Sequence, residues 1–190
     1  MDKLLTEIKS CQTCFNYLPH GINPVVTAST KSKIGIIGQA PGSVVHRTGI
    51  PWDDKSGERL RQWLNVSNEQ FYNPDNFALI PMGFCYPGKG KSGDRPPRKE
   101  CAPQWHDKLL NKIEDLKLII LFGKYAQHYY LGDKQKRTLT ETVHSFQEYS
   151  PLYLPLPHPS PRNNIWLKKN KWFERDLIPQ LQEIVRDCMI

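Results

Sequence analysis

The sequence of 190 residues predicts an α/β protein, built as a three-layer α/β/α sandwich around a central, mainly parallel sheet of about four strands. Short apolar runs alternate with stretches whose apolar residues recur at helical spacing, which is typical of strands joined by crossover helices. A chain of this length buries a sizeable core, and we expect a single domain over residues 1–190.

The first half of the chain supplies two of the expected strands. A short helix from Leu4 to Ser10 comes first, and the apolar run from Lys33 to Ile37 has the length of a buried strand. Residues 38–57 contain prolines and glycines that indicate an irregular ligand-binding loop, and residues 58–64 return to helical spacing. Phe77 to Ile80 is the second core strand.

The second half supplies the other two strands. Residues 87–98, rich in Pro, Gly and basic side chains, predict a loop. Lys117 to Phe122 is the clearest strand of the sequence, and Leu152 to Leu156 is the last. Helices are expected over residues 99–116, 124–131, 138–149 and 172–188. Pro179 is expected to kink or interrupt the closing helix.

The overall composition favours a polyanionic partner. The net charge is +7, and aromatic residues, which can stack on bases, make up 11% of the chain. The charge alone is equally consistent with a protein that has no acidic partner. No apolar run approaches the roughly 18 residues that cross a bilayer. The amino terminus also lacks the apolar core of a signal peptide, so we expect a cytoplasmic protein without a membrane partner.

Four cysteines have a spacing that suits a metal centre. Cys11 and Cys14 form a C-x2-C pair, and Cys85 and Cys101 follow far downstream. Four thiolates can hold an iron–sulfur cluster or a zinc ion, although a zinc site more commonly shows a second close pair. Small buried apolar side chains are the alternative explanation. Cys188, without a partner in sequence, is expected to serve packing.

Two loops carry the candidate chemistry. The first, residues 38–57, follows a predicted strand and contains Trp52, Asp53 and Asp54. The second, residues 158–163 with the sequence HPSPRN, follows the last strand and is stiffened by two prolines. Because α/β folds bind ligands at the carboxyl ends of parallel strands, both loops are expected to flank one site. A lone histidine is otherwise more often structural than catalytic.

These segments together resemble the uracil-DNA glycosylase superfamily. The resemblance is carried by GQAPG at residues 38–42, GIPW at 49–52 and HPSPRN at 158–163. The cysteine spacing is similar to that of the iron–sulfur branch, the fourth family, in which the last two cysteines flank an N-R-x-P pattern, here DRPP at residues 94–97. The resemblance implies a structural four-iron, four-sulfur cluster held by Cys11, Cys14, Cys85 and Cys101, with zinc as the less favoured occupant.

The resemblance also implies a mechanism and assigns residues to it. Such enzymes flip a damaged nucleotide out of the DNA stack and hydrolyse its N-glycosidic bond. His158 matches the histidine that hydrogen-bonds the uracil oxygen beside that bond, and Trp52 stands where the family has a stacking Phe. The remaining substrate contacts are expected from the backbone around Gly38, Gln39 and Ala40 and from a loop that wedges into DNA, with Pro159, Ser160 and Arg162.

Two positions depart from the family pattern. The fourth family has Glu where this chain has Gln39, and an amide cannot act as a base on water. Asp54 is the favoured replacement, because DKSG at residues 54–57 resembles the D-x-S-G of the fifth family. Asp53 is the second candidate, and helix capping is the alternative role for both. Pro81 replaces an Asn that reads the pairing edge of the base, and proline has no donor there.

The sequence therefore supports three hypotheses. The first is a monomeric DNA glycosylase of base excision repair that removes a deaminated base, uracil above others. The second is a DNA-binding protein with a glycosylase fold that either lacks hydrolytic activity or prefers another base, as Gln39 and Pro81 suggest. The third is an iron–sulfur hydrolase of small molecules, which the basic charge and the stiff second loop disfavour.

Overall fold

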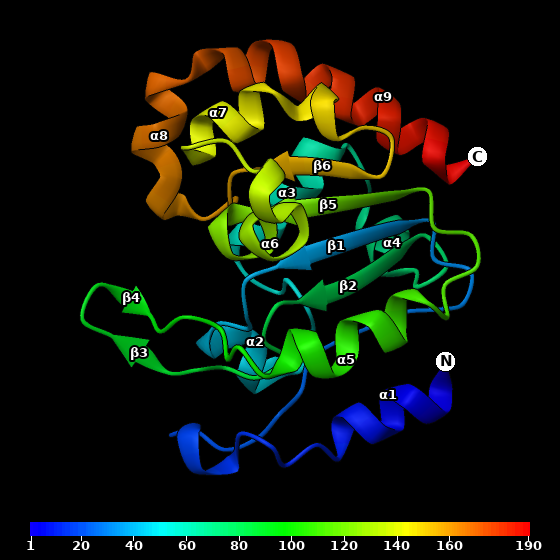
Figure 1. Ribbon diagram of the computed structural model, residues 1–190, viewed down its shortest axis with the longest axis vertical. Helices are drawn as coiled ribbons and strands as arrows, with labels where there is room; N and C mark the ends of the chain where they lie inside the picture. The colour runs from blue at the N-terminus through cyan, green and yellow to red at the C-terminus, as the bar shows by residue number, and fades with distance from the viewer.

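The computed structural model describes all 190 residues and contains a four-stranded sheet at its centre (Figure 1). Its strands are β1 (Ile34–Gly38), β2 (Phe77–Pro81), β5 (Leu118–Phe122) and β6 (Tyr153–Leu156), in the spatial order β2-β1-β5-β6. Every neighbouring pair is parallel. The predicted fold class is confirmed, and each expected strand lies within one residue of its predicted ends.

Helices cover both faces of this sheet and complete three layers (Figure 1). One face packs on α1 (Asp2–Lys9), α5 (Cys101–Leu110) and α6 (Gly123–Leu131). The other face packs on α3 (Lys55–Leu64), α4 (Asn68–Tyr72), α7 (Leu139–His144), α8 (Asn164–Lys169) and α9 (Ile178–Met189). Successive strand residues alternate between the two cores, as Ile36 and Ile37 do, because side chains of a strand point to opposite faces. The strands are apolar throughout for this reason.

Several helices begin or end where local chemistry dictates. Ser67 starts α4 and Thr138 starts α7, each as part of a capping box with a Gln or Glu three residues later. The closing helical segment is interrupted as predicted, since a π-helical turn at Phe173–Leu177 precedes α9 and Pro179 lies in its first turn.

The structure corrects the prediction for residues 38–57, which were expected to be irregular. They contain the helix α2 (Ser43–Thr48). Gly42, in an extended conformation, precedes the helix, and Gly49, at φ 71°, ends it in the left-handed conformation. These glycines therefore delimit a helix instead of preventing one, because a left-handed residue after a helix is most easily a glycine.

Three further boundaries differ from expectation. The predicted loop at 87–98 contains a short antiparallel hairpin, β3 (Lys89–Gly90) and β4 (Gly93–Asp94). The helix expected over 99–116 is shorter, because α5 ends at Leu110. The helix α8 follows the HPSPRN loop without having been predicted. Figure 1 shows the hairpin projecting beyond the carboxyl ends of β1 and β2.

The sheet topology determines where a site can form. Because all four strands are parallel, their carboxyl ends lie along one edge. The connection from β1 to β2 leads to one side of β1, whereas β5 pairs on its other side. This arrangement opens a crevice at the end of β1, which is where open α/β sheets bind ligands. None of the helices has the length and apolar character needed to cross a membrane.

Candidate functional site

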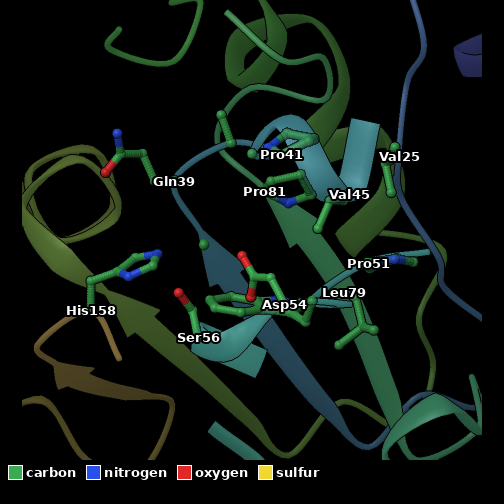
Figure 2. A pocket seen from close by; sticks show the side chains of 14 residues that line it. Val25, Gln39, Pro41, Val45, Pro51, Asp54, Ser56, Leu79, Pro81 and His158 are labelled. Atoms are coloured by element: carbon green, nitrogen blue, oxygen red, sulfur yellow. The ribbon is translucent and has the colours of Figure 1, made fainter. Parts of the chain in front are cut away.

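A pocket lies at this crevice, close to the end of β1 (Figure 2). It brings together six of the residues predicted from sequence: Gly38, Gln39, Ala40, Trp52, Asp54 and His158. The other lining residues are Val25, Pro41, Gly42, Val45, Pro51, Ser56, Leu79 and Pro81. The two predicted loops therefore do flank one cavity.

Trp52 forms the floor of this pocket in a strained backbone conformation. Its φ of 58° is unusual for a bulky residue. A Cβ atom at Gly38 would lie 2.8 Å from the Trp52 ring, and one at Gly57 would lie 1.7 Å from its carbonyl oxygen. Only glycine fits at these two positions. The ring also meets Phe122 edge-on, with centroids 5.8 Å apart, so it is fixed from several directions.

His158 also lines the pocket and stacks on Trp52, with ring centroids 5.5 Å apart. Desolvation lowers the pKa of His158 to about 4, so the imidazole is neutral at neutral pH. The backbone N–H of Ser160 donates to its Nδ1 at 3.2 Å. Because Nδ1 accepts this bond, the single ring proton is on Nε2. The pocket thus contains a neutral N–H donor.

The loop that carries His158 is held by its own hydrogen bonds. The Asn163 side chain donates to the carbonyl oxygen of His158 at 2.7 Å, and Arg59 donates to that of Ser160 at 3.3 Å. The Ser160 hydroxyl accepts from the backbone N–H of Arg162 at 3.2 Å. Pro159 is buried and Arg162 is exposed, and neither lines the pocket. The loop is therefore a rigid rim next to the cavity.

The two candidate carboxylates occupy different places. Asp54 lines the pocket and also caps α3, with its Oδ1 accepting from the N–H of Gly57 at 2.9 Å. Asp53 lines a separate depression beside Glu58 and Arg61. Figure 2 shows the carboxylate of Asp54 and the hydroxyl of Ser56 facing the same space as His158. Asp54 therefore performs the capping role and still presents a carboxylate to the pocket.

Gln39 contributes mainly its backbone. Its carbonyl oxygen accepts from the N–H of Gly83 at 3.0 Å, and that of Gly38 accepts from Met82 at 2.9 Å. These bonds attach the first loop to the chain that leaves β2. The side-chain amide of Gln39 points away from Asp54 and Pro81 (Figure 2).

The far wall of the pocket is apolar, and sequence reasoning missed it. Val25, Val45, Pro51 and Leu79 lie on this side, together with the ring of Pro81 (Figure 2). Val25 comes from the segment before β1 and has no local signal, because long-range backbone bonds place it there. Its N–H donates to the carbonyl oxygen of Phe84, and Thr27 forms a bridge with Leu79. Ser56 could have been predicted from the sequence, because it belongs to the DKSG segment.

Pro81 is supported from behind by a buried polar chain. His106, fully buried, lies with Nε2 3.1 Å from the carbonyl oxygen of Pro81 and Nδ1 2.7 Å from the hydroxyl of Tyr130. Desolvation lowers the pKa of His106 to about 4. The neutral ring therefore donates to Pro81 and accepts from Tyr130, which fixes the wall of the pocket.

The four candidate ligand cysteines, Cys11, Cys14, Cys85 and Cys101, line a second cavity of about 380 Å³. Burial raises the pKa of the Cys85 thiol to about 11 and of the Cys101 thiol to about 12. No group of three or more His, Cys, Asp or Glu side chains is arranged to hold one metal ion. Cys188 lies elsewhere, packed against the core.

Comparison with known protein families gives one match. A model of the uracil DNA glycosylase superfamily matches residues 25–182, which include the pocket, both of its loops and the whole sheet.

The close approach of Gly57 to Trp52 can be tested by substitution. We expect Gly57→Ala to lower the free energy of unfolding by about 3 kcal/mol, because its methyl group must displace the Trp52 carbonyl. The matched control is Gly35→Ala, whose Cβ would meet Ile119 at an ordinary 3.5 Å and should cost less than about 1 kcal/mol. Urea denaturation measures both. Equal losses for the two variants would contradict the packing described.

The low pKa values of His158 and His106 predict a stability that depends on pH. Below about pH 6.5 these histidines are protonated in the unfolded chain but remain neutral in the folded protein. Their contribution to the free energy of unfolding is therefore fully present above that pH and is lost as the pH falls toward about 4. Each histidine should contribute a loss of about 3 kcal/mol. Denaturation at a series of pH values measures the slope. His158→Gln should remove about half of the fall, and an unchanged slope would show that His158 is not buried in its neutral form.

Proposed function

The chain belongs to the uracil DNA glycosylase superfamily, whose members are DNA N-glycosylases, and we propose that it removes a deaminated base, uracil above others, from DNA. The observation that carries this proposal is the content of one pocket. An aromatic floor, a neutral imidazole N–H and a carboxylate face the same cavity at the end of β1. These are the groups that hydrolysis of an N-glycosidic bond requires.

The base reaches this pocket after it leaves the DNA stack. Trp52 offers a planar face that replaces the stacking lost on flipping. The backbone at Gly38, Gln39 and Ala40 borders the same space and is held to the chain after β2, so its polar groups are already in place. A preformed pocket of this kind limits the conformational entropy lost when the base binds.

His158 stabilises the leaving group in the proposed reaction. As the N-glycosidic bond breaks, the base takes up negative charge on the carbonyl oxygen beside that bond, and the sugar gains oxocarbenium character. The Nε2–H of His158 donates to this oxygen. A neutral donor needs no proton from solvent, and its fixed position costs no reorganisation during the reaction. Removing one such donor typically costs roughly 10²–10³ in rate.

Asp54 acts on the sugar and on the attacking water in the proposed reaction. One carboxylate oxygen is engaged by Gly57, and the carboxylate faces the pocket, where it can orient water and balance the positive charge on the sugar. Gln39 cannot take this role, because an amide does not accept a proton at neutral pH. Asp53, which lies outside the pocket, is the less favoured candidate.

Pro81 affects the choice of base. It lines the pocket without a hydrogen-bond donor, and the wall around it is apolar. A uracil in this pocket gains no hydrogen bond from Pro81, so its polar contacts come from His158, from backbone groups and from the other polar lining residues, such as Ser56. Hypoxanthine and xanthine share a carbonyl group with uracil and therefore belong in the same substrate panel.

The HPSPRN loop supports the flipped state in this proposal. Pro159, Ser160 and Arg162 form the rim beside His158. The guanidinium of Arg162 packs against Gly93 of the β3–β4 hairpin, and from there it can contact phosphate in this proposal. The Ser160 hydroxyl already accepts a bond within the loop, so its contribution is to stiffen the rim.

We further propose that Cys11, Cys14, Cys85 and Cys101 hold a four-iron, four-sulfur cluster. Four thiols that line one cavity form a suitable donor set. Ligation to iron offsets the cost of burying thiolates. The absence of a second close cysteine pair in the sequence favours a cluster over zinc. When bound, the cluster supplies no step of the hydrolysis and connects the amino-terminal segment to α5.

A DNA-binding protein without hydrolytic activity is the second candidate. Gln39 and the capping bond of Asp54 favour it, because both reduce the groups available to act on water. Such a protein binds DNA with strong salt dependence and leaves every substrate intact.

The proposed reaction predicts that the purified protein creates alkali-labile abasic sites in an oligonucleotide that contains uracil. Asp54→Asn retains a side-chain oxygen for the cap and removes the charge, so we expect a roughly 10²- to 10⁴-fold lower rate with little change in stability. Asp53→Asn is the matched control and should lose less than about threefold, because Asp53 lies outside the pocket.

Two results decide this experiment. If no base is released from uracil, hypoxanthine or xanthine substrates while DNA still binds, the second candidate is correct. If Asp54→Asn and Asp53→Asn retain equal activity, the role of Asp54 is wrong even though the activity stands.

The cluster predicts its own composition. Protein purified without oxygen should be brown and contain about four irons and four sulfides per chain. Cys85→Ala should lose the colour, whereas Cys188→Ala, the matched control, should keep it. Zinc at one equivalent without iron would refute the cluster.

A further inference from the structure

A second, wider groove of about 1200 Å³ lies on the surface and is not used by the proposed reaction. It is bounded by α6, by the start of α5 and by the chain that follows the β3–β4 hairpin. Three tyrosines, Tyr17, Tyr125 and Tyr129, line it, and Tyr17 and Tyr129 are 60% and 40% exposed. Aromatic side chains gathered in one surface groove are typical of an interaction site.

The groove is also positively charged. Arg95, Arg98 and Lys99 line it, and no Asp or Glu does. Arg98 is paired with Glu100 and lies over the ring of Tyr17, with its Cζ 4.4 Å from the centroid. Arg95 and Lys99 are exposed and form no salt bridge. Two cations are therefore available to a ligand.

Two chain segments border both the base pocket and the groove. Pro81 lines the pocket, and the next residue, Met82, lines the groove. On the other side, Gly123 begins α6 within 3.5 Å of the His158 Cβ, measured from an ideal Cβ position, and α6 carries Tyr125 and Tyr129. The segment after β2 and the start of α6 therefore lie between the pocket and the groove.

We propose that this groove binds unpaired nucleotides of the strand that carries the flipped base, with bases stacked on Tyr125 and Tyr129 and phosphates on Arg95 and Lys99. A basic groove interleaved with aromatic rings is the combination that binds single-stranded nucleic acid. In a duplex the bases are stacked on one another and cannot lie on tyrosine faces. The identity of the ligand as DNA rests on the proposed function.

The experiment compares binding to single-stranded and duplex DNA, measured by fluorescence anisotropy with labelled oligonucleotides of about 15 nucleotides that contain no damaged base. Tyr129→Leu keeps an apolar side chain against Tyr130 and removes the stacking face. We expect it to weaken single-strand binding roughly 5- to 100-fold and duplex binding much less. Phe15→Leu is the matched control, because Phe15 is 62% exposed and lies outside the groove.

The charge is tested separately. Lys99→Gln should lower the salt dependence of single-strand binding by about 0.7 in the slope of log K against log salt. Lys112 is an exposed lysine outside the groove, and Lys112→Gln should change this slope less.

Three results would overturn the proposal. The first is that Tyr129→Leu and Phe15→Leu weaken single-strand binding equally, and the second is that Tyr129→Leu weakens single-strand and duplex binding equally. The third is that the wild type binds no single strand and the groove binds an acidic peptide instead. Because no base is released in these measurements, they remain decisive even if the protein proves to lack glycosylase activity.

Discussion

The fixed position of Trp52 is the constraint on which the candidate site depends. Its ring and carbonyl occupy space that any side chain at Gly38 or Gly57 would fill. Its backbone is in a left-handed conformation that a tryptophan adopts only when its surroundings impose it. Packing against Phe122 and His158 supplies that restraint, so the strain is offset by the core beneath and the pocket above.

The parallel sheet explains why the candidate catalytic side chains lie together at one edge. The strands β1 and β6 are separated by β5, yet both end there, and the loops that follow them bring Asp54 and His158 to one cavity. Burial keeps the imidazole neutral, and the Ser160 N–H determines which nitrogen carries the proton. The same enclosure that lowers the pKa also makes a hydrogen bond to a developing anion stronger. The site therefore gains its donor from position and burial and not from charge.

Much of the fold and of the candidate site could be predicted from the sequence, and the features that could not be predicted have physical explanations. Continuous apolar runs gave the four strands, because a sheet covered on both faces requires them. The helix between Gly42 and Gly49 was missed, because a glycine that ends a helix and one that prevents it look alike in sequence. Val25 and the contact of Gly93 with Arg162 depend on distant chain segments and have no local signal.

The central claim is that an extrahelical base lies on Trp52 and is hydrogen-bonded by His158. A crystal structure with DNA that contains 2′-fluorinated deoxyuridine, whose N-glycosidic bond resists hydrolysis, tests it most directly. The account predicts a uracil ring over Trp52 with its carbonyl oxygen about 3 Å from Nε2 of His158. A uracil that remains stacked in the DNA, or that binds away from both side chains, would contradict it.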